Sequence, residues 1–127
     1  MLFRSHLAER NTNEVSSGEA RRILIARALV HGPRALVLDE PTTSLDMRAT
    51  HEMREILRKL AGNGISIVMV THHLPDIIPE MRRVILIREG RVFGDGPTQQ
   101  LLEAATLSTL FGIGVEVLER DGYYHVL

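Results

Sequence analysis

The sequence contains no cysteine, which excludes disulfide bonds and thiolate chemistry. No apolar run reaches the length needed to cross a bilayer. The first residues also lack the apolar core and the small-residue cleavage site of a secretory signal. The composition of the 127 residues, 44 % hydrophobic and 24 % charged, predicts one soluble globular domain.

Charge and histidine content argue against two further classes of protein. The formal net charge of −1 at pH 7 provides no basic footprint for nucleic acid. The six histidines are scattered and form no helical i, i+4 pair with a third ligand, so a structural metal site is not expected. Three arginines lie close together, and we expect structural ion pairs from them rather than a basic patch: Arg21, Arg22 and Arg27.

The chain is organised around residues 35–46, ALVLDEPTTSLD. Four apolar residues run directly into Asp39 and Glu40, and Pro41 ends the run. A short, continuously apolar segment of this kind predicts a fully buried strand in a parallel sheet that is covered on both faces. Ligands gather beyond the carboxyl ends of such strands, where two carboxylates suit a hydrated Mg²⁺ ion and an attacking water. The alternative is an ordinary strand-to-loop boundary, where acidic pairs are common.

Motifs on either side of this segment favour the first interpretation. Residues 15–22 read VSSGEARR and residues 70–73 read VTHH. In this order, the segments resemble the C-terminal half of an ABC-type ATPase. The resemblance implies an α/β fold, namely a partial P-loop NTPase sheet of the RecA-like ABC ATPase type with flanking helices. Its motifs are the signature at 15–22, Walker B with its catalytic glutamate at 36–40, the D-loop at 44–46 and the switch histidine at His72.

The phosphate-binding loop of such ATPases, G-x-x-x-x-G-K-[ST], does not occur in the sequence. Residues 1–14 carry no hydrophobic period and many polar groups, so we expect a frayed leader there. Because the chain begins almost at the signature, we expect residues 15–127 to be the C-terminal half of an ABC ATPase domain. In the family, the strand before the missing loop lies between the strands that correspond to 65–70 and 84–88. Two apolar strand edges should therefore stay unpaired, which predicts a poorly soluble or oligomeric polypeptide.

Helix and strand signals alternate along the chain, which predicts an α/β order. Ser16 and Glu19 have the spacing of a capping box, and the helix that follows is apolar on most sides over 21–30, so we expect it to be largely buried. Gly32-Pro33 should end it, with glycine as the C-cap. The other predicted elements are a strand at 35–39, a helix at 47–61, a strand at 65–70, a short helix with Pro75 in its first turn, a hairpin of 84–88 and 91–93, short helices at 97–104 and 107–111, and a hairpin of 115–118 and 123–126.

The start of the signature helix is a natural anion seat, since its backbone amides are free and its dipole end is positive. The resemblance implies that this seat faces the terminal phosphate of a nucleotide held by a second subunit. Ser16 is expected to donate its hydroxyl, and Gly18 to let the backbone approach. Ser17 and Glu19 stand where the family usually has glycine and glutamine, so Glu19 must point away from the phosphate or pair with Arg22. The alternative is an ordinary capped helix.

The resemblance also assigns roles to the polar ends of the two strands. Asp39 would hold Mg²⁺ through its water shell, and Glu40 would orient or deprotonate the attacking water. His72 could donate a hydrogen bond to the terminal phosphate, whereas His73 is expected to be a surface residue. Asp46 should cap the next helix and contact the partner subunit of a dimer. For His72, the alternative is an ordinary core or surface histidine.

The function implied by the resemblance is Mg²⁺-dependent ATP binding and hydrolysis by the energy-coupling subunit of a membrane transporter. The expected partners are a second ATPase subunit and transmembrane permease subunits, without nucleic acid, and the expected location is the cytoplasmic face of the cell membrane. Without the phosphate-binding loop, the polypeptide alone should be inactive. Residues 84–118 resemble importer ATPases, and Thr106–Val117 resembles the tails of subunits that serve iron-chelate or cobalamin-type importers.

Two other functions fit part of the same pattern. ABC-type ATPases of DNA repair and chromosome maintenance often carry a Ser-x-Gly-Glu signature, but they place a long coiled coil before it, and no heptads occur here. A non-catalytic regulator could retain the dimer face alone, yet it would have no reason to keep Glu40 and His72. The sequence does not specify the substrate, the direction of transport or the permease.

Overall fold

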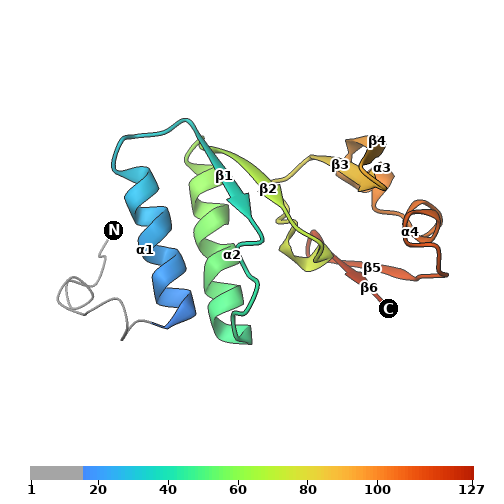
Figure 1. Ribbon diagram of the computed structural model, residues 1–127, viewed down its shortest axis with the longest axis horizontal. Helices are drawn as coiled ribbons and strands as arrows, with labels where there is room; N and C mark the ends of the chain where they lie inside the picture. The colour runs from blue at the N-terminus through green and yellow to red at the C-terminus, as the bar shows by residue number, and fades with distance from the viewer. Residues whose placement is uncertain (1–15) are drawn as a thin grey trace.

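The computed structural model describes residues 16–127, so the expected frayed leader at 1–14 lies outside the described residues. Figure 1 shows an α/β arrangement in which two long helices and two strands form one half of the molecule and smaller elements form the other. The elements are α1 (Ser17–Leu29), β1 (Ala35–Asp39), α2 (Met47–Gly62), β2 (Ser66–Val70), the 3₁₀ helix η3 (Leu74–Asp76), β3 (Arg83–Arg88), β4 (Arg91–Pro97), α3 (Thr98–Leu101), α4 (Ala104–Phe111), β5 (Val117–Arg120) and β6 (Tyr123–Val126).

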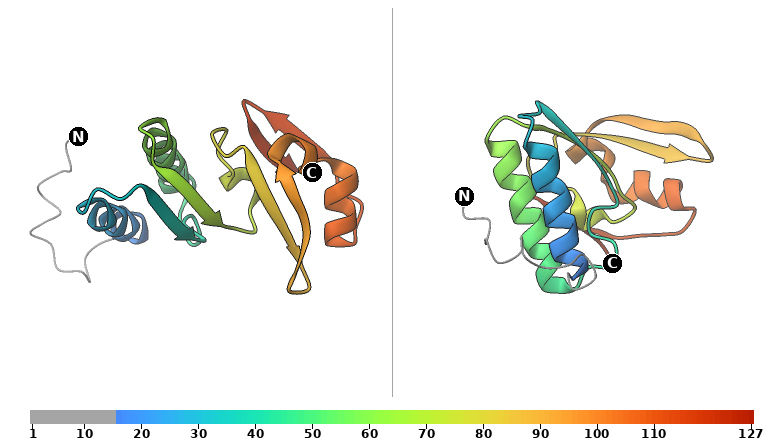
Figure 2. Two further views of the ribbon diagram at one scale, coloured as in Figure 1. Left: turned by 90° about the horizontal axis from the view of Figure 1, so that it is seen from above. Right: turned by 60° about the vertical axis from the view of Figure 1, so that its left-hand side comes forward.

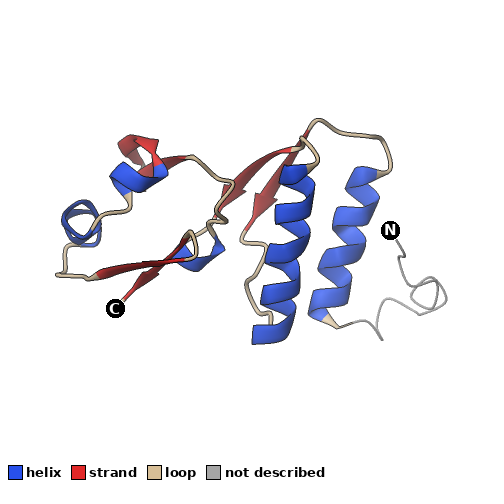
Figure 3. Cartoon of the chain, turned by 180° about the vertical axis from the view of Figure 1, so that it is seen from behind, coloured by secondary structure: helices blue, strands red, loops and turns tan. Residues whose placement is uncertain are grey.

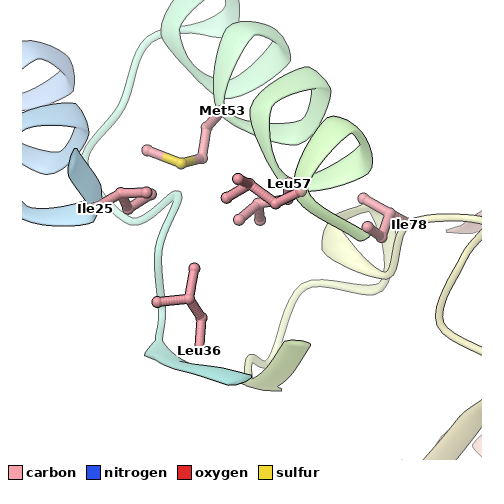
Figure 4. Packing of buried hydrophobic residues seen from close by; sticks show 6 residues of the cluster. Ile25, Leu36, Met53, Leu57 and Ile78 are labelled. Carbon is pink, nitrogen blue, oxygen red and sulfur yellow. The ribbon is translucent and has the colours of Figure 1, made fainter. Parts of the chain in front are cut away.

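Strands β1 and β2 form a parallel pair that runs from Ala35 opposite Ser66 to Asp39 opposite Val70. Helix α2 connects them, and α1 and α2 lie side by side against one face of the pair (Figures 1 and 2). Apolar side chains from the strands and both helices meet in the core between these layers (Figure 4). Its buried members are Ile25, Leu36, Met53, Leu57, Leu60 and Ile78.

The prediction that residues 35–39 form a fully buried strand between two covered faces is wrong. Successive side chains of a strand point to opposite faces, and only the side of β1 that carries Leu36 packs against the helices. Val37 points the other way and is 75 % exposed, and Val68 and Val70 on β2 are exposed as well. Among the described residues, no element covers this second face of the strand pair, which we call the bare face.

The prediction of a largely buried signature helix is also wrong. Of the residues of α1, only Gly18 and Ile25 are buried, whereas Leu24 is 62 % exposed. The helix packs on α2 along one side, and Leu29 near its end packs against the same core, whereas Ile23 is exposed like Leu24. The helix also ends at Leu29, so Gly32, with a φ of +61°, belongs to the following turn rather than to the C-cap.

The strand edges that were expected to be unpaired are unpaired within residues 16–127. The strands form three separate two-stranded sheets, β1 with β2, β3 with β4, and β5 with β6. One edge of β2 and one edge of β3 therefore have no strand partner among the described residues, and Ile85 and Ile87 on β3 are exposed. Figure 2 shows β2 and β3 as neighbouring but separate strands.

The carboxyl-terminal half contains the two predicted hairpins, with β4 extending four residues beyond the predicted end at Phe93. The β5–β6 hairpin packs toward η3, as seen from behind in Figure 3, and a second small core holds Leu102, Leu107 and Tyr124. Gly122 forms the β5–β6 turn with a φ of +80°, and a Cβ atom there would lie 2.9 Å from the Cβ of Pro79. Both backbone angle and space therefore require glycine at this position. None of the described helices has the length and apolar character needed to span a membrane.

Candidate functional site

Glu40 and His72 meet at the carboxyl edge of the β1–β2 pair. Because these strands are parallel neighbours, the residues that follow them emerge at the same edge of the sheet. The backbone N–H of Glu40 donates to the carbonyl of Val70 at 2.8 Å, which extends the strand pairing by one residue. Nδ1 of His72 then lies 2.5 Å from Oε1 of Glu40. Two residues that are 32 positions apart in the sequence thus form one polar pair.

The electrostatics of this pair keep Glu40 ionised. The hydrogen bond from His72 lowers the pKa of the Glu40 carboxyl, partial burial opposes this effect, and the charges of His72 and His73 add to the lowering. Both histidine side chains are exposed, as expected for His73, whereas the Glu40 side chain is 28 % exposed. An ionised carboxylate with one oxygen bound to histidine can accept a proton or orient a water through its other oxygen.

Helix α1, the predicted signature helix, holds the turn that carries Glu40. Glu40 has a φ of 46°, in the left-handed region that a residue with a side chain rarely adopts. Arg21 of α1 donates to the backbone carbonyls of Glu40 and Thr43, at 3.0 and 2.9 Å. Arg21 therefore forms no ion pair with any residue of 16–127, contrary to the prediction, because its side chain reaches carbonyl groups of this turn. Its contacts tie the backbone of Glu40 to helix α1, whose N-cap is Ser16.

The predicted capping box at the start of α1 is confirmed. The backbone N–H of Glu19 donates to the hydroxyl of Ser16, and the carboxylate of Glu19 accepts from the backbone N–H of Ser16, both at 3.2 Å. Glu19 therefore turns back onto the helix end, and Arg22 pairs instead with Glu52 at 2.8 Å. Arg27 makes no ion pair with any described residue, so only one of the three expected arginine pairs exists.

Gly18 has a packing role that was not foreseen. It is buried where α1 approaches α2, and a Cβ atom at this position would lie 3.0 Å from the Cβ of Ala49. Its neighbour Ser17 is exposed. In the described structure, no hydrogen bond joins Ser16 or Ser17 to Glu40 or His72. The binding of a second subunit's nucleotide by Ser16–Glu19 stays a prediction.

Asp39 is the best candidate for holding Mg²⁺. It is exposed at the end of β1, and its carboxylate makes no hydrogen bond or ion pair with residues 16–127. Mg²⁺ prefers oxygen ligands and commonly binds through one or two carboxylates while keeping several waters, so a free carboxylate at this edge fits the ion. The ligand atoms of Glu40, His72 and His73 also lie within 4.8 Å of one another, but this set contains two nitrogens and suits Mg²⁺ less well.

Asp46 caps helix α2, as predicted. Its carboxylate accepts a hydrogen bond from the backbone N–H of Ala49 at 2.7 Å. Its expected contact with a partner subunit stays a prediction. Ser44, two residues before Asp46, has a φ of 65°, so residues 40–46 include two left-handed residues that are not glycine, Glu40 and Ser44.

Sequence reasoning missed one residue of the site, Asp76. This aspartate is 1 % exposed at the end of η3, and its carboxylate accepts hydrogen bonds from Thr42, Thr71 and Arg54. A Pro-Asp pair in a short helix is an ordinary surface pattern, so the sequence provided no sign of burial. The only available signal was that Asp76 follows the polar end of β2 by a few residues.

Comparisons with known proteins show which family this chain resembles in sequence and fold. The family model described as "AAA domain, putative AbiEii toxin, Type IV TA system" matches residues 1–78. The hemin import ATP-binding protein HmuV of Hahella chejuensis is 34 % identical over 120 residues, which cover 89 % of this chain and 47 % of that protein. The chain spans only 23 % to 47 % of the length of four curated relatives that it matches.

Two solved structures have the same fold. One is titled "An inward-facing conformation of a putative metal-chelate type ABC transporter"; its TM-score is 0.84 at 26 % identity, with 96 % of this chain and 51 % of that chain covered. The other is the dimeric post-hydrolysis state of the ATP-binding cassette MJ0796 bound to ADP and Pi; its TM-score is 0.62 at 30 % identity, with 73 % of this chain and 40 % of that chain covered.

The parallel strand pair with helices on one of its faces is part of the ABC ATPase fold. The chain belongs to the AAA-domain family whose model it matches, and its relatives are ATP-binding proteins of ABC transporters.

Proposed function

We propose that this chain carries the catalytic half of an ATP-hydrolysing subunit that powers a membrane transporter. The observation that carries this proposal is the pairing of Glu40 with His72 at the carboxyl edge of β1 and β2, at 2.5 Å. An ionised carboxylate and an imidazole at one sheet edge are suited to a water and to a terminal phosphate, respectively.

Each residue of the site has a distinct task in this proposal. Glu40 orients the attacking water or accepts its proton through Oε2, the carboxylate oxygen that is not bonded to His72. His72 donates a hydrogen bond to the terminal phosphate when nucleotide is bound, and it contacts Glu40 when nucleotide is absent. Asp39 holds Mg²⁺ through the water shell of the ion. When bound with the nucleotide, Mg²⁺ supplies neutralisation of the phosphate charge.

The signature residues act on a nucleotide held by a second subunit. The start of α1 supports this assignment because it is the positive end of a 13-residue helix, with Ser16 as its N-cap and Gly18 in its first turn. Ser17 and Glu19 belong to the same binding segment, and Asp46 contributes to the face between the two subunits. A dimeric relative bound to ADP and Pi is consistent with this arrangement.

The remaining partners are transmembrane permease subunits, so the proposed location is the cytoplasmic face of the membrane. The match to the hemin import protein HmuV, over 89 % of this chain, supports an importer. The structure titled as a metal-chelate type ABC transporter covers 96 % of it. We therefore propose a metal chelate as the class of transported substrate, with no role for nucleic acid.

A chimera tests the catalytic part of this proposal. The 127 residues replace the corresponding segment of HmuV from Hahella chejuensis, which supplies the phosphate-binding loop, and ATP hydrolysis is measured with and without Mg²⁺. We expect Mg²⁺-dependent hydrolysis that falls by roughly 100-fold or more in Glu40→Gln, since general base catalysis is typically worth that much. The matched control is Asp95→Asn, an exposed carboxylate paired with Arg83 far from the site. Hydrolysis that is insensitive to Glu40→Gln in a folded chimera would refute the proposal.

A further inference from the structure

The carboxylate of Asp76 is the most completely satisfied buried charge in the described part of the chain. Its Oδ1 accepts two hydrogen bonds from the guanidinium of Arg54, from Nε at 3.2 Å and from Nη2 at 2.8 Å. Its Oδ2 accepts the hydroxyls of Thr42, in a short hydrogen bond, and of Thr71 at 3.2 Å. Helix α2, the turn after β1 and the end of β2 are therefore joined at a single side chain.

Both threonines flank the candidate catalytic residues. Thr42 lies in the turn that starts at Glu40, and Thr71 directly precedes His72. The Thr71 hydroxyl lies within reach of two carboxylates, Oδ2 of Asp76 at 3.2 Å and Oε2 of Glu40 at 3.5 Å. A hydroxyl has one proton to donate, and the shorter distance favours Asp76 as its acceptor. Oε2 of Glu40 is thereby left with long contacts only, to the hydroxyls of Thr71 and Thr43 at 3.5 Å each, and can still accept a proton from elsewhere.

Packing alone does not require a charge at this position. Burying a carboxylate and a guanidinium removes both from water, and an apolar pair of the same volume often gives equal or greater stability. What the charged pair provides is a fixed orientation of four hydrogen bonds, which two apolar side chains cannot reproduce. The turn after β1 starts at Glu40, and the end of β2 leads into His72. Both segments that Asp76 binds therefore carry a residue of the candidate site.

We propose that Asp76 is a positioning residue for ATP hydrolysis, which holds the Glu40 turn and the His72 strand end at a fixed separation and keeps the Thr71 proton away from Glu40. This inference rests on the proposed function, because it assigns Glu40 as the group that receives the proton. Arg54 takes part in the same positioning, since its two hydrogen bonds to Oδ1 hold the Asp76 carboxylate with Oδ2 toward the threonines.

Asp76→Asn is the decisive variant because it preserves shape. Arg54 donates two hydrogen bonds, so the amide oxygen must face it and the NH₂ group must face the threonines. The hydroxyl of Thr71 then accepts from this NH₂ group and turns its own proton to Glu40. This new hydrogen bond occupies Oε2 of Glu40, the oxygen that would otherwise receive the proton of the attacking water.

The first readout does not depend on hydrolysis. Backbone amide NMR signals of Glu40 and His72 are recorded at one neutral pH for wild type, Asp76→Asn and Asp95→Asn, each in a Val37→Lys/Val68→Lys background that opposes self-association. We expect Asp76→Asn to shift both signals, because it rearranges the hydrogen bonds of Thr42 and Thr71, and Asp95→Asn to leave them unchanged. Unchanged signals in folded Asp76→Asn would overturn the inference.

The second readout is turnover in the HmuV chimera. We expect Asp76→Asn to lower kcat by roughly 10- to 100-fold with little change in KM, since a small displacement of the reacting groups has an effect of that size. Asp76→Glu keeps the charge and should recover part of the lost rate. An equal rise in KM, or a loss that Asp76→Glu does not relieve, would indicate a purely structural role.

The two proposals fail in different ways. If Glu40→Gln leaves hydrolysis intact, the proposed function is wrong. If Glu40→Gln abolishes hydrolysis while Asp76→Asn changes neither kcat nor the amide signals of Glu40 and His72, only the positioning role is wrong.

Discussion

The two faces of the β1–β2 strand pair have similar sequences and different surroundings. One face packs Leu36 into the core beneath α1 and α2, while the bare face exposes Val37, Val68 and Val70. Valine and leucine are equally apolar choices for a strand, so composition does not distinguish the two faces. An apolar strand face therefore indicates a surface on which another element can pack, even when the described residues contain no such element.

The largest expected effect is a core deletion on the covered face. Leu57 of α2 is fully buried between the helices and the strands. Leu57→Ala should lower the free energy of unfolding by about 2–5 kcal/mol, because it removes buried methyl groups and leaves a cavity. Urea denaturation followed by circular dichroism measures this change. A loss below about 1 kcal/mol would mean that this core is loosely packed in solution.

The turn of the β5–β6 hairpin lies on neither face of the β1–β2 pair and gives a reference for a purely local effect. Gly122→Ala places a methyl group against Pro79 and forces alanine into a φ of +80°. We expect a destabilisation of about 1–3 kcal/mol from backbone strain and overlap, smaller than that of Leu57→Ala. The same denaturation experiment tests it, with Gly64→Ala as a control for strain alone, because a Cβ there meets nothing within 4 Å at a φ of +87°. Equal losses in both variants would remove the contact with Pro79 from the explanation.

The cap of α2 affects the covered face indirectly, because α2 is the main element on it. Asp46→Ala removes the acceptor of the Ala49 N–H at 2.7 Å. The expected loss is about 1 kcal/mol, which is typical of an N-cap deletion. Asp46→Asn retains an acceptor and should recover most of it. If Asp46→Asn and Asp46→Ala are equally unstable, the cap does not explain the loss.

Acid should weaken the sheet edge where Glu40 lies. The pKa of Glu40 is lowered in the folded chain, chiefly by His72, so this carboxylate stabilises the fold at pH values above its ordinary pKa of 4.5. That contribution is lost as pH falls through the lowered pKa. The free energies of unfolding of wild type and Glu40→Gln should therefore differ most near neutral pH and converge in acid. A difference that grows as pH falls would contradict the sign of the shift.

The smallest energetic effect is expected on the bare face. Val37→Ala should change the free energy of unfolding of the monomer by less than about 0.5 kcal/mol, because Val37 is largely exposed. The bare face and the unpaired edges instead predict self-association of the isolated polypeptide. Val37→Lys with Val68→Lys should shift the population toward monomer in analytical ultracentrifugation. A wild-type chain that is monomeric at high concentration would contradict this prediction.

Local chemistry explains most of what could be predicted from the sequence. The capping box of Ser16 and Glu19 and the cap at Asp46 involve residues three positions apart, so spacing alone reveals them. The meeting of Glu40 with His72 followed from one further step, the pairing of two apolar runs as parallel neighbours. The resemblance to ABC ATPases added the order of motifs, and the comparisons bear that family out.

The contacts that were missed are all long-range. Arg21 was expected to pair with an acid, but it lies opposite two carbonyl groups of the turn at Glu40. Asp76 could not be distinguished from a surface residue, because its partners Thr42 and Arg54 are 34 and 22 positions away. The exposure of α1 was missed for the same reason, since the sequence of an apolar helix does not indicate which of its sides will pack against another element.

The sequence by itself therefore determined the secondary structure, the helix caps and the order of polar residues at two strand ends, because these depend on neighbouring residues and on a repeating period. Only the tertiary structure decided which sheet face is covered, which carboxylate is buried and which arginine binds it. Those outcomes depend on how distant segments fill a shared space, and hydrogen-bond partners are chosen among all groups that the fold brings within about 3 Å.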